Sequence, residues 1–173
     1  MRSSKIIKKK DPWGKFLIKL GITSLLMAAT AAYGLARYDF GFDSQVNRCL
    51  HPYKAFAIDK WDQQIVQGDY LAFHAFGMGP FFHDGQVVVK QVVAMKGDEV
   101  EVRDGNIFIN GVFRYGGFQE AGLQGKPLSS FNMKRTLGEG EYYMYGWHPL
   151  SYDSRYWGTI TQDQVIGETH ALF

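Results

Sequence analysis

The chain has 173 residues, enough for one domain and a short appendage, and its apolar and aromatic content is sufficient for a hydrophobic core. Its formal net charge is only +2, but the first 36 residues carry seven Lys and Arg against one acid. The remaining residues carry 12 basic and 16 acidic groups, so the part that could fold is acidic on balance. That balance argues against a nucleic-acid-binding domain, which would present a basic face.

The first predicted element is an apolar helix near the N-terminus. The segment FLIKLGITSLLMAATAAYGLA, residues 16–36, is long enough to cross a bilayer, which takes about 20 helical residues. Basic residues concentrate before it, so the positive-inside rule predicts a cytoplasmic segment 1–15, a transmembrane anchor 16–37 and an exported domain 38–173.

A cleaved secretory signal is the alternative interpretation of the same segment. Gly34, Leu35 and Ala36 have the small-x-small pattern of a cleavage site. The anchor is favoured, and both interpretations export the domain that follows.

Cys49 is the only cysteine, and it lies in the stretch NRCLHPYKAF shortly after the apolar segment. In an oxidising compartment a lone cysteine is buried, paired with another chain, or a reactive thiol. The ordinary interpretation is a buried residue of the hydrophobic core, since free cysteine packs like a small hydrophobic side chain. A nucleophile is the alternative, and it would need a base or a positive charge beside it.

Strands and tight turns dominate the rest of the chain. Asp104–Gly105 and Asn110–Gly111 are typical of two-residue hairpin turns, and residues 116–130 are predicted to form a loop. The predicted strands cover residues 70–76, 86–95, 99–102, 106–109, 141–146 and 164–172. The predicted class is therefore mainly β, behind one N-terminal helix.

Lys90 interrupts the strand QVVVKQVVAM. Alternation places it on the same face as Val88 and Val92. A solvated strand lysine is the default interpretation of this stretch alone. If that face is covered instead, desolvation favours the neutral amine, which can act as a base.

The stretch SYDSRYWG holds a dense polar run at residues 151–155. Asp153 and Arg155 are spaced to pair, and the hydroxyl of Ser151 could hold a catalytic lysine in place. Taken alone, this composition favours an ordinary polar loop with an ion pair.

Together these segments resemble the type I signal peptidases, which are membrane-anchored Ser/Lys proteases. CLHP (49–52) is similar to the family's Ser-Met-x-Pro box, with cysteine in the place of serine. QGDYLAF is similar to the family's Gly-Asp box, with Gly68 and Asp69 at the Gly-Asp positions. VKQVVAMKGD is similar to its lysine box, and SYDSRYWG reproduces its last box. The resemblance covers about residues 45–168.

Two departures accompany this resemblance. GWHP, residues 146–149, stands where the family has Gly-Asp-Asn before the last box. The chain is also short, with one anchor and no large insertion, which resembles the TraF-type pilin peptidases of conjugative plasmids. PYKAF, residues 52–56, is a loose version of that subgroup's sequence after the nucleophile.

The resemblance implies roles for individual residues. Cys49 would be the nucleophile, Lys90 the general base and Ser151 the hydroxyl that orients the lysine. The backbone N–H of Cys49 and the side chain of Asn47 would form the oxyanion hole. Asp153 and Arg155 would brace the site, with Asp153 counted among the catalytic residues.

The resemblance also implies partners and location. The substrate would be a membrane-tethered precursor, in the TraF-type subgroup a pilin, cleaved after small residues and in some members made circular. The chain would span the bacterial inner membrane once, with a periplasmic catalytic domain, near other components of a conjugation or type IV secretion apparatus. No cofactor, metal or nucleic acid is expected.

Two other functions compete with this one. A cysteine protease could use a histidine, with His148 and His51 as candidates, while His74, His83 and His170 show no metal-ligand spacing. A non-catalytic scaffold subunit of a secretion apparatus would keep the fold without the chemistry.

Overall fold

A computed structural model describes residues 13–43, 49–50 and 52–172. It divides into two compact units, one ending at Arg37 and the other beginning at Tyr38. The first contains helix α1, Trp13–Arg37, which has no buried residue. Among the described residues, α1 is the one helix long and apolar enough to cross a membrane.

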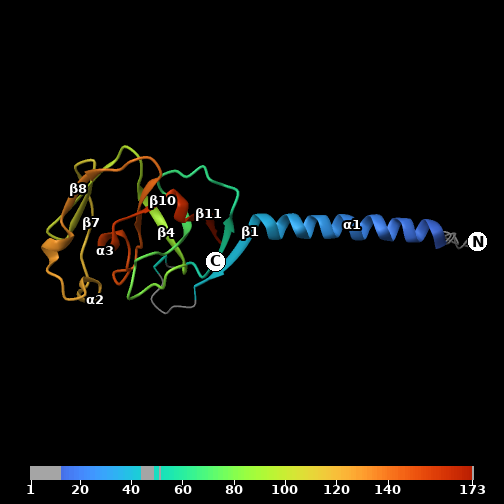
Figure 1. The fold of residues 1–173 in the computed structure, drawn as a ribbon, viewed down its shortest axis with the longest axis horizontal. Helices are drawn as coiled ribbons and strands as arrows, with labels where there is room; N and C mark the ends of the chain where they lie inside the picture. The colour runs from blue at the N-terminus through green and yellow to red at the C-terminus, as the bar shows by residue number, and fades with distance from the viewer. Residues whose placement is uncertain (1–12, 44–48, 51, 173) are drawn as a thin grey trace, which may run out of the picture. The chain divides into compact units, whose positions relative to one another are not determined.

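The second unit is built from two antiparallel sheets (Figure 1). In the larger sheet the strand order is β1-β2-β11-β3-β4-β9-β10, and in the smaller one it is β7-β6-β5-β8. The large-sheet strands are β1 Tyr38–Phe42, β2 Ala55–Asp59, β3 Tyr70–His74, β4 Val87–Ala94, β9 Glu141–Tyr145, β10 Thr159–Thr161 and β11 Val165–Ala171. The small-sheet strands are β5 Glu99–Arg103, β6 Asn106–Ile109, β7 Val112–Gly116 and β8 Met133–Thr136. The predicted mainly-β class behind one N-terminal helix is confirmed.

Each face of the strands β4 and β9 packs into a different core. Tyr142 and Met144 of β9 join a cluster with Leu71, Phe73 and Val92. Tyr143 and Tyr145, the alternating residues of the same strand, join a second cluster with residues of the small sheet. Because successive side chains point to opposite faces, one strand can close both cores.

The tight turns follow their local chemistry. Asp104 and Gly105 have φ of 50° and 76°, and Asn110 and Gly111 have φ of 53° and 75°, as hairpin turns of the predicted kind require. These two turns join β5 to β6 and β6 to β7. Both hairpin predictions are confirmed.

The two Gly-Asp pairs singled out in the sequence make equivalent turns before strands. The Asp69 carboxylate accepts from the Val66 N–H at 2.8 Å, and the Asp98 carboxylate accepts from the Met95 N–H at 3.0 Å. Gly68 precedes Asp69 with a φ of 107°, a conformation that favours glycine. Both carboxylates therefore bind the backbone of the turn that leads into β3 or β5, and Asp98 also accepts from the Asn110 side chain at 2.8 Å.

The sequence analysis missed several short elements. The strands β1, β2, β7, β8 and β10 were not predicted, and neither was the helix α3, Ser154–Trp157. The segment 116–130, predicted as a loop, contains the helical turns α2, Glu120–Leu123, and η1, Leu128–Phe131. Elements of three to five residues are stabilised by their tertiary neighbours and leave little periodicity in the sequence.

Candidate active site

Lys90 lies in the middle of β4 and is only 1% exposed. Val88 and Val92, two residues away on either side, are buried as well, so the predicted shared face is observed. Its Nζ donates a hydrogen bond to the Oγ of Ser151 at 3.1 Å and lies 5.8 Å from the centre of the Phe82 ring. The default interpretation of a solvated strand lysine is wrong, because the Lys90 side chain is almost completely buried, with Ser151 and Phe82 near its amine.

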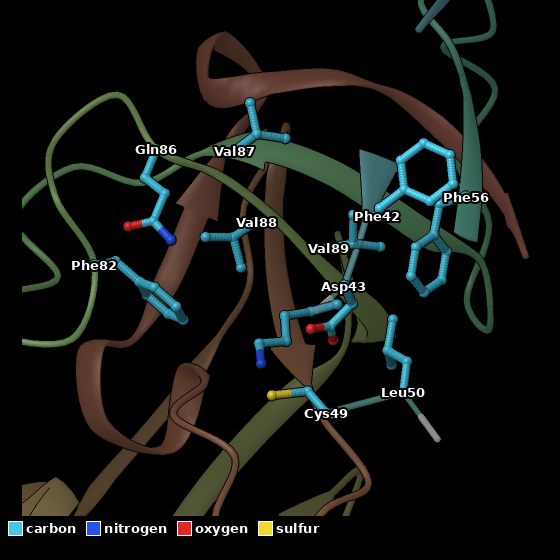
Figure 2. Close-up of a pocket in the computed structure, with 11 residues that line it drawn as sticks. Phe42, Asp43, Cys49, Leu50, Phe56, Phe82, Gln86, Val87, Val88 and Val89 are labelled. Carbon is cyan, nitrogen blue, oxygen red and sulfur yellow. The ribbon is translucent and has the colours of Figure 1, made fainter. Parts of the chain in front are cut away.

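Cys49 shares a pocket with Lys90. The pocket has a volume of about 290 Å³, and its walls include Leu50, Phe82 and the residues 87–89 of β4. Figure 2 shows Cys49 among the residues that line this pocket, with its sulfur pointing away from Leu50. Cys49 is a half-buried free cysteine, and it lines the same pocket as the buried lysine.

The backbone beside Cys49 is fixed by the segment that follows β9. The carbonyl of Cys49 accepts from the N–H of His148 at 3.3 Å. The N–H of Ser151 in turn donates to the carbonyl of His148 at 2.8 Å. The segment GWHP, which differs from the family's Gly-Asp-Asn, therefore links Cys49 to Ser151 through backbone hydrogen bonds of His148.

Gly146 is a site residue that the sequence analysis missed. A Cβ at this position would lie 2.1 Å from the Ser151 Oγ and 3.1 Å from the Cys49 Cβ. No side chain fits between these two residues. The only signal in the sequence was the glycine that ends the strand EYYMYG, which a strand terminus explains equally well.

Ser151 is buried, and a buried ion pair hydrogen-bonds to its backbone carbonyl. Asp153 and Arg155 are 0% and 4% exposed, and the Arg155 Nε lies 2.7 Å from the Asp153 Oδ1. Arg155 also donates to the Ser151 carbonyl at 3.0 Å and to the Gly117 carbonyl at 2.7 Å. The structure thus brings Ser151, Asp153 and Arg155 together.

Further hydrogen bonds hold this pair in place. The other Asp153 carboxylate oxygen accepts from the Gly146 N–H at 3.0 Å, so the pair also supports the glycine beside the site.

Desolvation lowers the pKa of Arg155, but the hydrogen bonds and charge of Asp153 outweigh it and leave that pKa raised. Burial, reinforced by the Asp153 charge, raises the pKa of Tyr143 well above its usual value. Arg155 therefore remains charged and Tyr143 remains neutral at ordinary pH.

Half of β4 presents a free edge beside this pocket. β9 pairs with β4 at Gln91, Val92 and Ala94, and the pairing ends where Gln91 meets Tyr145. Residues 87–90 are paired with β3 on one side, and the described part of the chain adds no strand on the other. An extended peptide could therefore join the sheet directly beside Cys49 and Lys90.

His148 is poorly arranged to act as the base. Its Nδ1 accepts a hydrogen bond from the N–H of Leu150 at 3.1 Å. A neutral imidazole that accepts at Nδ1 carries its proton at Nε2, so neither nitrogen has a lone pair left for the thiol.

Two candidates cannot be placed. Asn47 and His51 lie outside the described residues. Within the ranges that the structure describes, no group of three His, Cys, Asp or Glu side chains could hold a metal ion.

Comparison with known proteins identifies relatives over most of the chain. The family model described as "Signal peptidase, peptidase S26" matches residues 17–173. Signal peptidase IB of Staphylococcus aureus is 26% identical over 123 residues, which cover 63% of this chain and 61% of that protein. Thylakoidal processing peptidase 1 of Arabidopsis thaliana is 29% identical over 89 residues, covering 51% of this chain and 25% of that protein.

A crystal structure of a signal peptidase I from Enterococcus faecalis also aligns with this chain. The TM-score is 0.40 and the identity 26%, with coverage of 65% of this chain and 99% of the other. The chain spans less than two thirds of the length of the curated relatives that it matches.

Proposed function

Because the chain belongs to the signal peptidase family, peptidase S26, we propose that it is an endopeptidase that cleaves exported precursors with Cys49 as nucleophile and Lys90 as general base. One observation carries this proposal. Lys90 is almost completely buried, donates to Ser151 at 3.1 Å and lines the same pocket as Cys49. A lysine buried to this extent is costly in a purely structural role, whereas a general base requires such a position.

The first half of the reaction forms an acyl-enzyme. Lys90, oriented by Ser151, takes the proton of the Cys49 thiol, and the thiolate attacks the scissile carbonyl carbon. The tetrahedral intermediate collapses to a thioester as the C–N bond breaks, and the Lys90 ammonium returns its proton to the departing amine.

The second half releases the acyl group. Lys90 removes a proton from a water molecule, which attacks the thioester carbonyl. Collapse of this intermediate breaks the C–S bond, yields the free carboxyl end of the product, and restores the Cys49 thiol with the proton held by Lys90.

We also propose an oxyanion hole made by the Cys49 N–H and the Asn47 amide. Each such donor typically contributes about 3 kcal/mol to stabilising the transition state. Asp153 and Arg155 act on the reaction indirectly, by holding the Ser151 carbonyl and the Gly146 N–H.

The substrate is an extended segment that pairs with residues 87–90 of β4 and presents small residues before the cut. The TraF-type resemblance supports a conjugative pilin precursor, and a thioester suits transfer of the acyl group to an amine that would close a circular pilin. Helix α1 would anchor the enzyme in the bacterial inner membrane with the catalytic unit periplasmic, which confines enzyme and precursor to one surface.

Processing of the precursor in cells tests this proposal. Cys49→Ala should abolish processing, and Lys90→Ala should slow it by about 10²–10⁴-fold, the usual contribution of a general base. Cys49→Ser tests whether the site accepts the family's usual nucleophile. Mass spectrometry of the rapidly quenched enzyme should show a thioester adduct on Cys49.

Two outcomes would favour the competing functions. If His148→Ala, and not Lys90→Ala, stops cleavage, the enzyme is a Cys/His protease, contrary to the hydrogen bond of its Nδ1. If Cys49→Ala processes the precursor normally, the chain is a non-catalytic scaffold.

A further inference from the structure

A second pocket is lined in part by Ser151, the residue that accepts the hydrogen bond of Lys90 from the Cys49 pocket. Its volume is about 210 Å³, and Ser151 and Tyr152 form part of its wall together with Phe81, Leu150 and Tyr156. Cys49 and Lys90 are not among its lining residues. The mechanism proposed above leaves this pocket without a role.

The wall of the pocket is apolar, because its tyrosine hydroxyls are already engaged elsewhere. The Tyr156 hydroxyl accepts from the Gln119 N–H at 2.7 Å. The Tyr152 hydroxyl accepts from the Gln124 side chain at 3.0 Å and donates to the Gly79 carbonyl at 3.3 Å. A ligand in this pocket therefore meets mainly ring and aliphatic carbon.

The aromatic wall is held rigidly. Tyr152 and Tyr156 stack with ring centres 5.1 Å apart, and Phe81 lies 4.7 Å from Tyr152. Gly122 packs so closely under Tyr156 that a Cβ there would lie 2.3 Å from the ring. A preformed wall loses little conformational freedom when it binds a side chain.

The path of the substrate leads toward this pocket. A peptide paired along residues 87–90 cannot continue past Lys90, because from Gln91 onward β9 occupies that position beside β4. The peptide must leave the sheet there, where Ser151 lies 3.1 Å from Lys90. Phe81 and Phe82, which are adjacent in sequence, line the second and the first pocket respectively.

We infer that the second pocket binds a large apolar side chain of the precursor within the first few residues after the cut. The inference rests on the proposed function, in which the residues before the cut occupy the Cys49 pocket. With this pocket, the enzyme selects a large apolar residue after the cut in addition to the small residues expected before it.

Internally quenched peptides test this inference with the full-length enzyme in detergent. The peptides share Ala-x-Ala before the cut and carry either Leu or Ala at one of the three positions after it. The wild type should cleave the best Leu peptide at least about 10-fold more efficiently than its Ala counterpart, which is a typical contribution of a few buried methylenes. In Phe81→Ala this ratio in kcat/KM should fall close to one.

Phe76→Ala is the matched control. Phe76 and Phe81 lie in the same connection between β3 and β4 and are 55% and 47% exposed, but only Phe81 lines the pocket. Phe76→Ala should keep the wild-type ratio. An unchanged ratio in Phe81→Ala, or no preference in the wild type, would overturn the inference.

A binding measurement separates this inference from the proposed function. Peptides that correspond to the segment after the cut, with Leu or Ala, are titrated onto the full chain and followed by fluorescence anisotropy. Tighter binding of the Leu peptide, together with no cleavage of any internally quenched peptide, would overturn the proposed function and retain the pocket. Equal binding of both peptides would overturn the pocket.

Discussion

Gly146 has no room for a side chain in the candidate site. A methyl group there would overlap with the Ser151 Oγ, 2.1 Å away, and would lie only 3.1 Å from the Cys49 Cβ. Ser151 would have to move away from Lys90, which breaks the hydrogen bond that orients the lysine. The glycine is therefore a geometric requirement of the site.

We expect Gly146→Ala to lower kcat/KM by at least about 10²-fold, since a displacement near 1 Å has this effect in catalytic sites. Gly41→Ala is the control, because nothing lies within 4 Å of a Cβ at that strand position. Peptide cleavage and thermal unfolding of both variants provide the measurement. Full activity in Gly146→Ala would mean that the Lys90–Ser151 contact is dispensable.

The buried pair of Asp153 and Arg155 is a second residue-scale feature. Removing one partner leaves an uncompensated charge with almost no exposure to water. We expect Asp153→Ala to lower the free energy of unfolding by about 3–5 kcal/mol, as measured for broken buried ion pairs. Urea unfolding followed by tryptophan fluorescence would test this.

The exposed pair of Lys134 and Glu99 provides the contrast. Its N–O distance is 3.1 Å, but both side chains are solvated. Lys134→Met should change the stability by less than about 1 kcal/mol. If Asp153→Ala were equally mild, the proposed bracing role of Asp153 would be wrong.

At the scale of elements, Glu141 connects strands of the two sheets. It begins β9 of the large sheet, and its carboxylate pairs with Arg135 of β8 in the small sheet at 2.6 Å. It also accepts from the Gly138 N–H at 2.7 Å. The Gly138 hydrogen bond and then Arg135 lower the pKa of Glu141 below its usual value.

Because this pKa is lowered on folding, Glu141 stabilises the folded state above its unfolded-state pKa, and this contribution is lost as the pH falls through the folded-state value. Glu141→Gln should therefore destabilise the protein near neutral pH by about 0.5–1 kcal/mol. Unfolding measured between pH 7 and the acid limit should show the two proteins converging at low pH. A constant difference across that range would contradict this assignment.

At the scale of the whole molecule, the chain combines an apolar helix with a two-sheet β unit. Every described residue of α1 is at least partly exposed, including Leu25, Leu26 and Met27 at 62–70%. A stretch of this length and composition is stable in hydrocarbon because the helix satisfies its own backbone hydrogen bonds.

We expect the full chain to remain in the membrane fraction after alkaline carbonate extraction. Replacing Leu25, Leu26 and Met27 with Asp should release it, since each charge at the bilayer centre costs about 2.5–3.5 kcal/mol. A reporter enzyme that is active only in the periplasm, fused after residue 173, should be active. An inactive reporter on a membrane-bound chain would reverse the proposed orientation.

The sequence alone predicted those features whose causes are local. Asp104 and Asn110 tolerate positive φ because their polar side chains are short, and Gly105 and Gly111 because they have no Cβ, so the hairpins could be located without a structure. Alternation in β4 placed Lys90 with Val88 and Val92, and the ordered motifs predicted the family that the comparisons then supported.

Tertiary structure decided what depends on contacts between distant segments. Alternation shows which face Lys90 shares, but only the packing of distant residues such as Phe82 and Ser151 near its amine determines that this side chain is closed to water. The space at Gly146 and the free edge of β4 likewise depend on where β9 ends relative to its neighbours. Burial, close approach and strand pairing are properties of several chain segments at once, and no single stretch of sequence contains them.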